Sequence, residues 1–410
     1  MERRILLNPG PATTTDSVKQ AQIVPDICPR EKEFQNLMKS IRRDLVKIAG
    51  GNKNYSAVLF AGSGTAVMES TMISVVPEGE WALIVSNGTY GKRFKEIADT
   101  IGIPNLEIEF NYGEKIDLKK IKAAFNSGIN FGTVFVTHHE TTTGILNPIK
   151  EIGDLVKKHN CLYVIDTISS FAGIPFSIQK VKADFIMSTS NKCLQGMAGV
   201  SFVIGKKEEI EKCKYNSRSY YLDLYSQYKY LEEKGQMRFT APVQTMYALR
   251  QALDELLEEG LENRYERYKK NHKVLVDGMR ERKFRLFLTQ YVEHSCILET
   301  FYELKGMDFQ KFHDKLYEEG FTVYPGKLDN KNTFRLANMG DLKEEDIELF
   351  LKAVDKVLDL KKKRFCRLCG ALCYGTVCMK CNKKEKTRKL SVQYHSRRWK
   401  RKQKEKKNET

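Results

Sequence analysis

Reactive side chains stand directly after several apolar runs of this chain, in an order that suggests shared chemistry. Lys192 closes the run 186–191, and Asp166 lies 26 residues upstream, after another apolar run. Two more segments follow such runs: the hydroxyl-rich 140–144 and the glycine-rich 62–65, which opens a helical pattern. In an open α/β sheet the carboxyl ends of the strands meet at one edge, where ligands bind. We therefore expect these groups to form one site.

The four kinds of group are those that pyridoxal phosphate (PLP) requires. An amine forms a Schiff base with the cofactor, and an anion keeps the pyridinium nitrogen protonated, so that the ring is an electron sink. A hydroxyl is needed near the ring oxygen, and a helix N-terminus with free N–H groups can hold the phosphate. Each residue alone is ordinary, because most strand-end charges are solvated or capping residues. Their order predicts a PLP site.

A larger set of motifs carries a resemblance to a known family. The chain resembles the class V (fold-type I) aminotransferases from about residue 6 to residue 360, and within them the 2-aminoethylphosphonate–pyruvate aminotransferase branch. Asn-Lys-Cys-x-Gln-Gly and Ser-Arg-Ser are more specific to this branch than to the alanine–glyoxylate branch. The segments that carry the resemblance are 6–11, 25–31, 85–93, 139–144, 190–196, 216–219, 238–242, 324–327 and 334–338.

The resemblance implies a role for each cofactor-binding residue. Lys192 is expected to bind PLP covalently and to shuttle the proton, and Asp166 to pair with the pyridinium nitrogen. Tyr90 is expected to stack on the ring, and Thr141 to bond the ring oxygen. The phosphate is expected to be held by Ser63, Gly64, Thr65 and Asn191, with Thr240 contributed by a partner subunit.

Substrate recognition is expected to depend on Arg335, because a guanidinium is the natural bidentate partner of a carboxylate or phosphonate. Arg30 and Gly10 are further substrate-binding candidates. The implied reaction transfers the amino group of 2-aminoethylphosphonate to pyruvate, giving phosphonoacetaldehyde and L-alanine, in a homodimer. Two alternatives stay open: an alanine- or serine–glyoxylate aminotransferase, and a nucleic-acid-binding protein on an aminotransferase scaffold. A cysteine desulfurase is disfavoured, because Cys296 lies in an apolar context.

The periodicity predicts an α/β fold with a mostly parallel seven-stranded sheet, since strand-like runs alternate with helical patterns. Residues 1–260 are expected to form the PLP-binding large domain, with segment 1–30 contributing to the active site. Residues 261–360 are expected to form a smaller α+β domain. The expected sheet strands are 56–61, 81–86, 106–110, 133–137, 161–165, 185–188 and 199–204.

The net charge of +17 is concentrated in the tail 361–410, which holds 19 Lys and Arg against 3 Asp and Glu. Residues 1–360 keep 50 basic and 49 acidic residues, an ordinary near-neutral body. Two Cys-x2-Cys pairs in the tail predict a tetrahedral zinc knuckle. The basic stretch beyond them suits RNA or another polyanion, or is a solvated tail without a partner. The expected zinc ligands are Cys366, Cys369, Cys378 and Cys381, with Cys373 as an alternative.

Several classes of protein are disfavoured by composition. No run of 18 apolar residues exists, so no transmembrane helix is expected. The first residues lack a long apolar stretch, so no secretory signal is expected. The five cysteines of residues 1–360 are scattered without pairing logic, which predicts a reducing, cytoplasmic environment.

Overall fold

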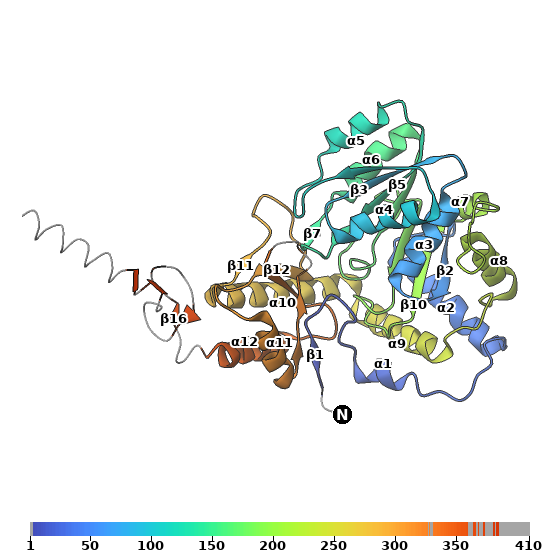
Figure 1. Ribbon diagram of the computed structural model, residues 1–410. Helices are drawn as coiled ribbons and strands as arrows, with labels where there is room; N and C mark the ends of the chain where they lie inside the picture. The colour runs from blue at the N-terminus through green and yellow to red at the C-terminus, as the bar shows by residue number, and fades with distance from the viewer. Residues whose placement is uncertain are drawn as a thin grey trace, which may run out of the picture.

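The computed structural model describes residues 3–326, 328 and 331–359, and within the tail residues 364–365, 368, 372–373, 380–381 and 383–384. Its centre is a seven-stranded sheet in the order β2-β10-β9-β8-β5-β3-β4 (Figure 1). Only β10 runs against its neighbours in this sheet, so the expected mostly parallel sheet is confirmed. The strands are β2 (Tyr55–Ala61), β3 (Trp81–Ser86), β4 (Asn105–Glu109), β5 (Phe131–Thr137), β8 (Leu162–Asp166), β9 (Phe185–Thr189) and β10 (Val200–Lys206).

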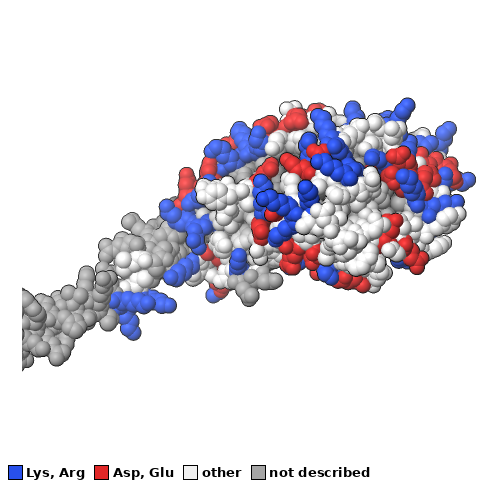
Figure 2. Space-filling model, turned by 90° about the horizontal axis from the view of Figure 1, so that it is seen from above, with Lys and Arg blue, Asp and Glu red and all other residues white. Residues whose placement is uncertain are grey.

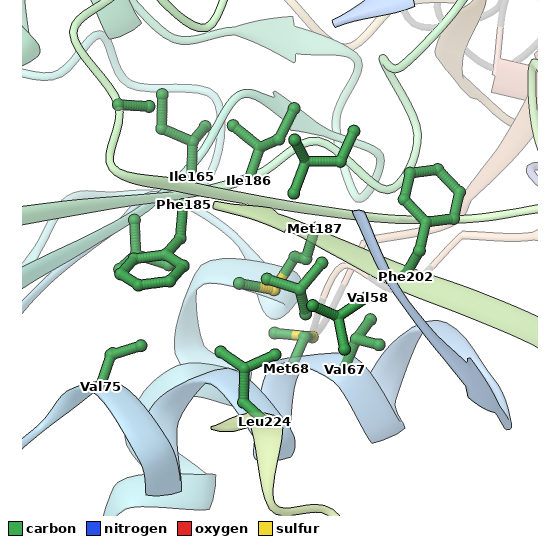
Figure 3. Packing of buried hydrophobic residues seen from close by; sticks show 14 of the residues in the cluster. Val58, Val67, Met68, Val75, Ile165, Phe185, Ile186, Met187, Phe202 and Leu224 are labelled. Atoms are coloured by element: carbon green, nitrogen blue, oxygen red, sulfur yellow. The ribbon is translucent and has the colours of Figure 1, made fainter. Parts of the chain in front are cut away.

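Helices cover this sheet on both faces, because its strands are apolar at consecutive positions. All five residues of β9 are buried, and Figure 3 shows Phe185 and Met187 on one side of it and Ile186 on the other. Helix α3 supplies Val67 and Met68 to the side of Phe185 (Figure 3). The surrounding helices are α2 (Lys32–Ile48), α3 (Gly64–Val75), α4 (Thr89–Ile101), α5 (Leu118–Phe125), α6 (Ile149–Val156), α7 (Lys207–Lys212), α8 (Leu224–Lys234) and α9 (Val243–Glu259).

A second hydrophobic cluster forms around a four-stranded sheet in the order β11-β12-β15-β14. The long helix α10 (Leu261–Glu281) runs from the large sheet to this unit (Figure 1). The N-terminal strand β1 (Ile5–Leu6) pairs with β13 (Phe321–Thr322), so the start of the described chain belongs to this unit. The remaining elements of the unit are β11 (Arg285–Leu286), β12 (Leu298–Tyr302), α11 (Phe309–Glu318), β14 (Tyr324–Pro325), β15 (Thr333–Ala337) and α12 (Glu344–Leu358).

Smaller elements complete the description. The short helix α1 (Asp16–Gln20) follows the N-terminal loop, and a hairpin of β6 (His139–Glu140) and β7 (Ile145–Leu146) follows β5. The 3-10 turn η1 (Lys157–His159) extends α6. In the tail, β16 (Arg364–Phe365) pairs with β17 (Leu372–Cys373). No helix in the described ranges has the length and hydropathy needed to span a bilayer.

The expected zinc knuckle falls largely outside the described residues. Cys366, Cys369 and Cys378 are not among them, whereas Cys381 is half-buried. Within the described part of the chain, no group of three metal-ligating side chains converges. The body itself carries both charge signs interspersed over the face seen in Figure 2, as its near-neutral composition predicts.

Candidate active site

Lys192 lies in the turn after β9, underneath the N-terminal loop. Its ammonium group donates a hydrogen bond to the carbonyl oxygen of Pro9. The loop is held in place by the N–H of Ala12, which donates to the carbonyl of Asn191 at 3.0 Å. A Cβ atom at Gly10 would stand 2.6 Å from Lys192 Nζ, and Gly10 has a φ of +120°, so both sterics and backbone require glycine there.

Burial lowers the pKa of Lys192, and the positive charge of Arg335 adds to this effect. Asp166 and Tyr90 act in the opposite direction on the same pKa. These groups are therefore near enough to influence one another electrostatically. A lysine whose pKa is lowered spends more of its time as a neutral amine, which is the form that acts as a nucleophile or base.

Asp166 is the last residue of β8 and is buried. Its Oδ1 accepts a hydrogen bond from the N–H of Ile168 at 2.7 Å, whereas Oδ2 has no hydrogen-bond partner in the described ranges. Burial raises the pKa of Asp166 to about 7; the nearby Glu140 also raises it, whereas Arg93 and Lys192 lower it. One carboxylate oxygen is thus free for a cationic partner, which would return the group to its ionised form.

The first turn of α3 provides the expected phosphate cradle. Ser63 is the N-cap, and its side chain makes no capping hydrogen bond. The N–H groups of a helical first turn have no partner within the helix, so they are available to an anion. A Cβ atom at Gly64 would lie 2.9 Å from Ile168 Cδ1, which places Ile168, two residues after Asp166, directly beside the cradle.

Helix α4 brings Tyr90 and Arg93 to the same edge of the sheet. The guanidinium of Arg93 lies 4.8 Å from the centre of the Tyr90 ring and donates a hydrogen bond to Thr65 Oγ1 at 3.4 Å. Arg93 therefore links the aromatic expected over the cofactor to the residue expected under its phosphate. The phosphate cradle accordingly has a fixed positive charge beside it.

Glu140 anchors the start of α4. Its buried carboxylate accepts hydrogen bonds from the backbone N–H groups of Tyr90 at 3.1 Å and Gly91 at 3.0 Å. It also accepts from the N–H of Thr142 at 3.0 Å. Burial nevertheless raises the pKa of Glu140. One side chain thus fixes the position of Tyr90 relative to the loop that carries Thr141.

Arg335 is 1% exposed and lies in β15 of the smaller sheet. Its Nη1 donates to the carbonyl of Thr141 at 3.3 Å and its Nε to the carbonyl of Pro325 at 3.3 Å. No carboxylate of the described residues forms an ion pair with it. A buried guanidinium that contacts only neutral carbonyls lacks the anion that would offset its desolvation.

Two expected site residues lie elsewhere on the same chain. Arg30 donates to Gln236 Oε1 at 2.9 Å, to the carbonyl of Met237 at 2.7 Å and to that of Arg238 at 3.3 Å. None of the hydrogen bonds that Arg30 donates within the described residues reaches Lys192 or Arg335. Thr240 is exposed. Arg30 therefore binds segment 236–240, which precedes α9, and Thr240 is the last residue of that segment.

The structure brings most of the expected residues to one edge and adds others that the sequence interpretation assigned no role. Glu140, Arg93 and Ile168 were not singled out, although all three adjoin expected site residues. The sequence signals available for two of them were a glutamate that opens the hydroxyl-rich run 140–144 and an arginine three residues after Tyr90. Lys192, Asp166, Gly10, Asn191, Ser63, Gly64, Thr65, Tyr90, Thr141 and Arg335 belong to this edge through the contacts described above.

Comparison with known proteins identifies the family that this arrangement represents. The family model for aminotransferase class-V matches residues 19–328. The chain belongs to the class-V aminotransferase family. It is 40% identical over 359 residues to a 2-aminoethylphosphonate–pyruvate transaminase of Vibrio vulnificus, covering 86% of this chain and 97% of the relative. A protein of the same name from Lysinibacillus sphaericus is 37% identical over 358 residues, covering 87% and 98% of the two chains.

Solved structures agree with this class-V aminotransferase assignment. The crystal structure of an alanine–glyoxylate aminotransferase from Nostoc sp. superposes with a TM-score of 0.81 at 28% identity, covering 87% of this chain and 96% of the other. A pyridoxamine–pyruvate aminotransferase from Mesorhizobium loti, at 22% identity and a TM-score of 0.80, shares the fold. It covers 89% of this chain and 94% of the other.

Burial disfavours the thiolate form of two cysteines near the site of this aminotransferase. Burial raises the pKa of Cys193, the neighbour of Lys192, to about 12, and that of Cys296 also to about 12. A thiolate is the nucleophilic form of cysteine, so neither residue is activated at neutral pH. This agrees with the expectation that Cys296 is a packing residue.

Proposed function

We propose that this aminotransferase transfers the amino group of 2-aminoethylphosphonate to pyruvate, giving phosphonoacetaldehyde and L-alanine. The observation that carries the proposal is Arg335, a buried guanidinium without an anionic partner in the described chain, beside Lys192. Phosphonate and carboxylate are both acidic groups that such a fork binds. The relatives at 37–40% identity that carry this name support the choice of substrate.

The site residues fit PLP, because its ring nitrogen and its phosphate would each meet groups without a hydrogen-bond partner in the described chain. Asp166 Oδ2 would face the pyridinium nitrogen, and the first turn of α3 at Ser63, Gly64 and Thr65 would hold the phosphate. When bound, PLP supplies an electron sink for the carbanion formed at the substrate carbon. Tyr90 and Ile168 would flank the ring, Thr141 would bond the ring oxygen, and Asn191 would support the phosphate.

Lys192 would carry the covalent attachment and then move the proton. Its lowered pKa favours the neutral amine, which is the form that would take a proton from the substrate carbon and later release it. The N-terminal loop at Pro9 and Gly10 would cover this amine and limit the access of water. Gly10 would also leave room beside Lys192 for the substrate.

Replacing Arg335 with lysine should lower kcat/KM for 2-aminoethylphosphonate by tens-fold or more. A lysine cannot reproduce the planar fork, and the acidic group would lose a charged hydrogen bond in a buried setting, at about 1.5–3 kcal/mol. Steady-state kinetics with pyruvate as acceptor would measure the effect. Arg285→Lys, in the edge strand β11 of the same sheet, is the matched control and should keep the wild-type value. An unchanged kcat/KM for Arg335→Lys would place this residue outside the site.

An amino-donor screen would decide between the proposed substrate and the alternative. With pyruvate as acceptor, 2-aminoethylphosphonate should give the highest kcat/KM of the donors. If alanine or serine with glyoxylate as acceptor is turned over faster, the chain is an alanine–glyoxylate-type enzyme, which its likeness to the Nostoc structure also accommodates.

We also infer that the active form is a homodimer with composite sites. Thr240 is exposed, and Arg30 braces the preceding segment through the carbonyls of Met237 and Arg238. Arg30 thus holds segment 236–240 in place, and the exposed hydroxyl of Thr240 at its end would donate to the cofactor phosphate in a partner subunit. Sedimentation of the active enzyme should give about twice the 47.3 kDa of one chain. A fully active species with the mass of one chain would contradict this inference.

The tail is proposed to be a separate zinc module with polyanion affinity. Cys366, Cys369, Cys378 and Cys381 should bind one zinc ion through thiolates, and the metal would supply the folding energy of so short a segment. Elemental analysis of the full-length protein should find one zinc per chain, lost on removal of residues 361–410, while transamination persists. RNA should bind the tail more weakly as salt rises. A metal-free full-length protein would remove the knuckle.

A further inference from the structure

A basic pocket lies at the opposite end of β2 from the active site. Strand β2 starts at Tyr55 in this pocket and ends at Ala61, just before the cradle at Ser63. Its seven residues separate the two places by roughly 20 Å at about 3.3 Å per residue. The pocket, here called the α2–β2 pocket, has a volume of about 410 Å³ and is lined by six cations: Lys39, Arg42, Arg43, Lys47, Lys53 and Lys207.

The α2–β2 pocket is far more positively charged than residues 1–360 as a whole. Residues 1–360 contain 50 basic and 49 acidic residues, whereas this pocket has six cations and one lining carboxylate, Glu232. Glu232 is already bound by Arg42 and by Ser56 Oγ at 3.0 Å. Arg43 pairs with Asp44 at 2.8 Å. Four ammonium groups remain without an ion pair in the described chain: Lys39, Lys47, Lys53 and Lys207.

The floor of the pocket is rigid. Arg42 is buried and donates from Nε to the carbonyl of Ala57 at 2.7 Å and from Nη2 to Ser56 Oγ at 2.7 Å. Its guanidinium is thereby locked, and its charge is fixed beneath the flexible lysines. Like charges held around one concavity repel one another, and an anion that entered would relieve this repulsion.

A second cavity adjoins the first and has a volume of about 490 Å³. The two cavities share Asn52, Lys53, Tyr55 and Lys207, and the second adds Asn54, Gln179, Lys206 and Glu208. Lys206 is paired with Asp184 at 2.8 Å. The cationic end of this concave surface is therefore the α2–β2 pocket, whereas the second cavity contributes amides and the carboxylate of Glu208.

We propose that the α2–β2 pocket binds a small anion that carries two or more phosphate groups. Four ammonium groups without an ion pair in the described chain are neutralised better by several phosphate groups than by a single phosphate group. Lysine binds phosphate as a point charge. The concave shape and limited volume suit a compact molecule rather than an extended nucleic acid. The site is separate from the transamination site.

Titration of full-length, cofactor-saturated enzyme with inorganic tripolyphosphate by calorimetry tests the proposal. The double variant Lys47→Gln/Lys53→Gln should bind about tenfold or more weakly than wild type, since each loses a charged contact. The matched control Lys119→Gln/Lys122→Gln removes two charges from α5 and should bind as wild type does. Both variants should keep the basal transaminase rate, which confirms that they fold.

The comparison of variants separates this pocket from the basic tail, which all the proteins retain. Equal tripolyphosphate affinity in both double variants would assign the binding to the tail and overturn the proposal. Absence of saturable binding to wild type would overturn it as well. If the pocket variant lost affinity for a single-stranded RNA but not for tripolyphosphate, the surface would serve nucleic acid instead.

Discussion

Lys192→Ala should abolish transamination and the visible absorption band of a covalently bound cofactor. Lys192 is the amine that the structure places against the N-terminal loop, in the turn after β9. Replacing Lys192 removes both the covalent attachment and the group that moves the proton, so neither step of the reaction can proceed at this site. Absorbance spectra after PLP addition and single-turnover kinetics with 2-aminoethylphosphonate would measure the two losses independently.

A surface lysine provides the control for this experiment. Lys180→Ala, at an exposed position, should retain both the absorption band and turnover. Wild-type protein that acquires no band on addition of PLP would exclude the proposed cofactor. A Lys192→Ala variant that still turns over at the wild-type rate would move the attachment to another residue.

Asp166→Asn should reduce kcat a hundredfold or more while leaving the fold intact. The amide has the same shape, but it cannot supply the buried anion that a pyridinium nitrogen requires. Loss of one partner of a buried ion pair costs roughly 3–5 kcal/mol, and each 1.36 kcal/mol in the barrier is tenfold in rate. Steady-state kcat at saturating PLP would report the change.

Asp184 offers a matched comparison for that variant. It is a buried aspartate at the opposite edge of the same sheet, where it accepts from the N–H of Tyr163 at 2.7 Å and pairs with Lys206. Asp184→Asn should lower the melting temperature with little change in kcat, because its partners are structural. If both variants lost kcat equally, the effect of Asp166 would be one of stability rather than of chemistry.

The large sheet could be predicted because its strands are long apolar runs bounded by polar residues. Expected and observed ends differ by two residues or fewer, as for 133–137 against β5 (Phe131–Thr137). Helix α8 (Leu224–Lys234) was not expected from the sequence. Its buried residues are Leu224, Gln227, Tyr228 and Leu231, and Gln227 donates a hydrogen bond to the backbone of β2. That glutamine weakens the apolar pattern that sequence periodicity depends on.

The sequence singled out the side chains proposed to contact the cofactor, but it did not indicate the backbone groups that hold them in place. The partners of Glu140 are N–H groups of Tyr90 and Gly91, about fifty residues away, and no side-chain pattern reveals them. Arg30 was expected near the substrate, but carbonyls of Met237 and Arg238 use its donors within this chain. Every residue except proline carries the same backbone donor and acceptor, so their choice of partner appears only in the fold.

The pairing of β1 with β13 has a consequence for the order in which the enzyme can be completed. Ile5 meets Phe321, although more than three hundred residues of chain separate them. During synthesis on the ribosome the first strand therefore has no partner until most of the chain has emerged. The large sheet can assemble earlier from contacts between neighbouring segments, whereas the pairing of β1 with β13 must wait. Nascent chains should thus acquire their central sheet well before the strand that precedes the Gly10 loop is fixed in its final place.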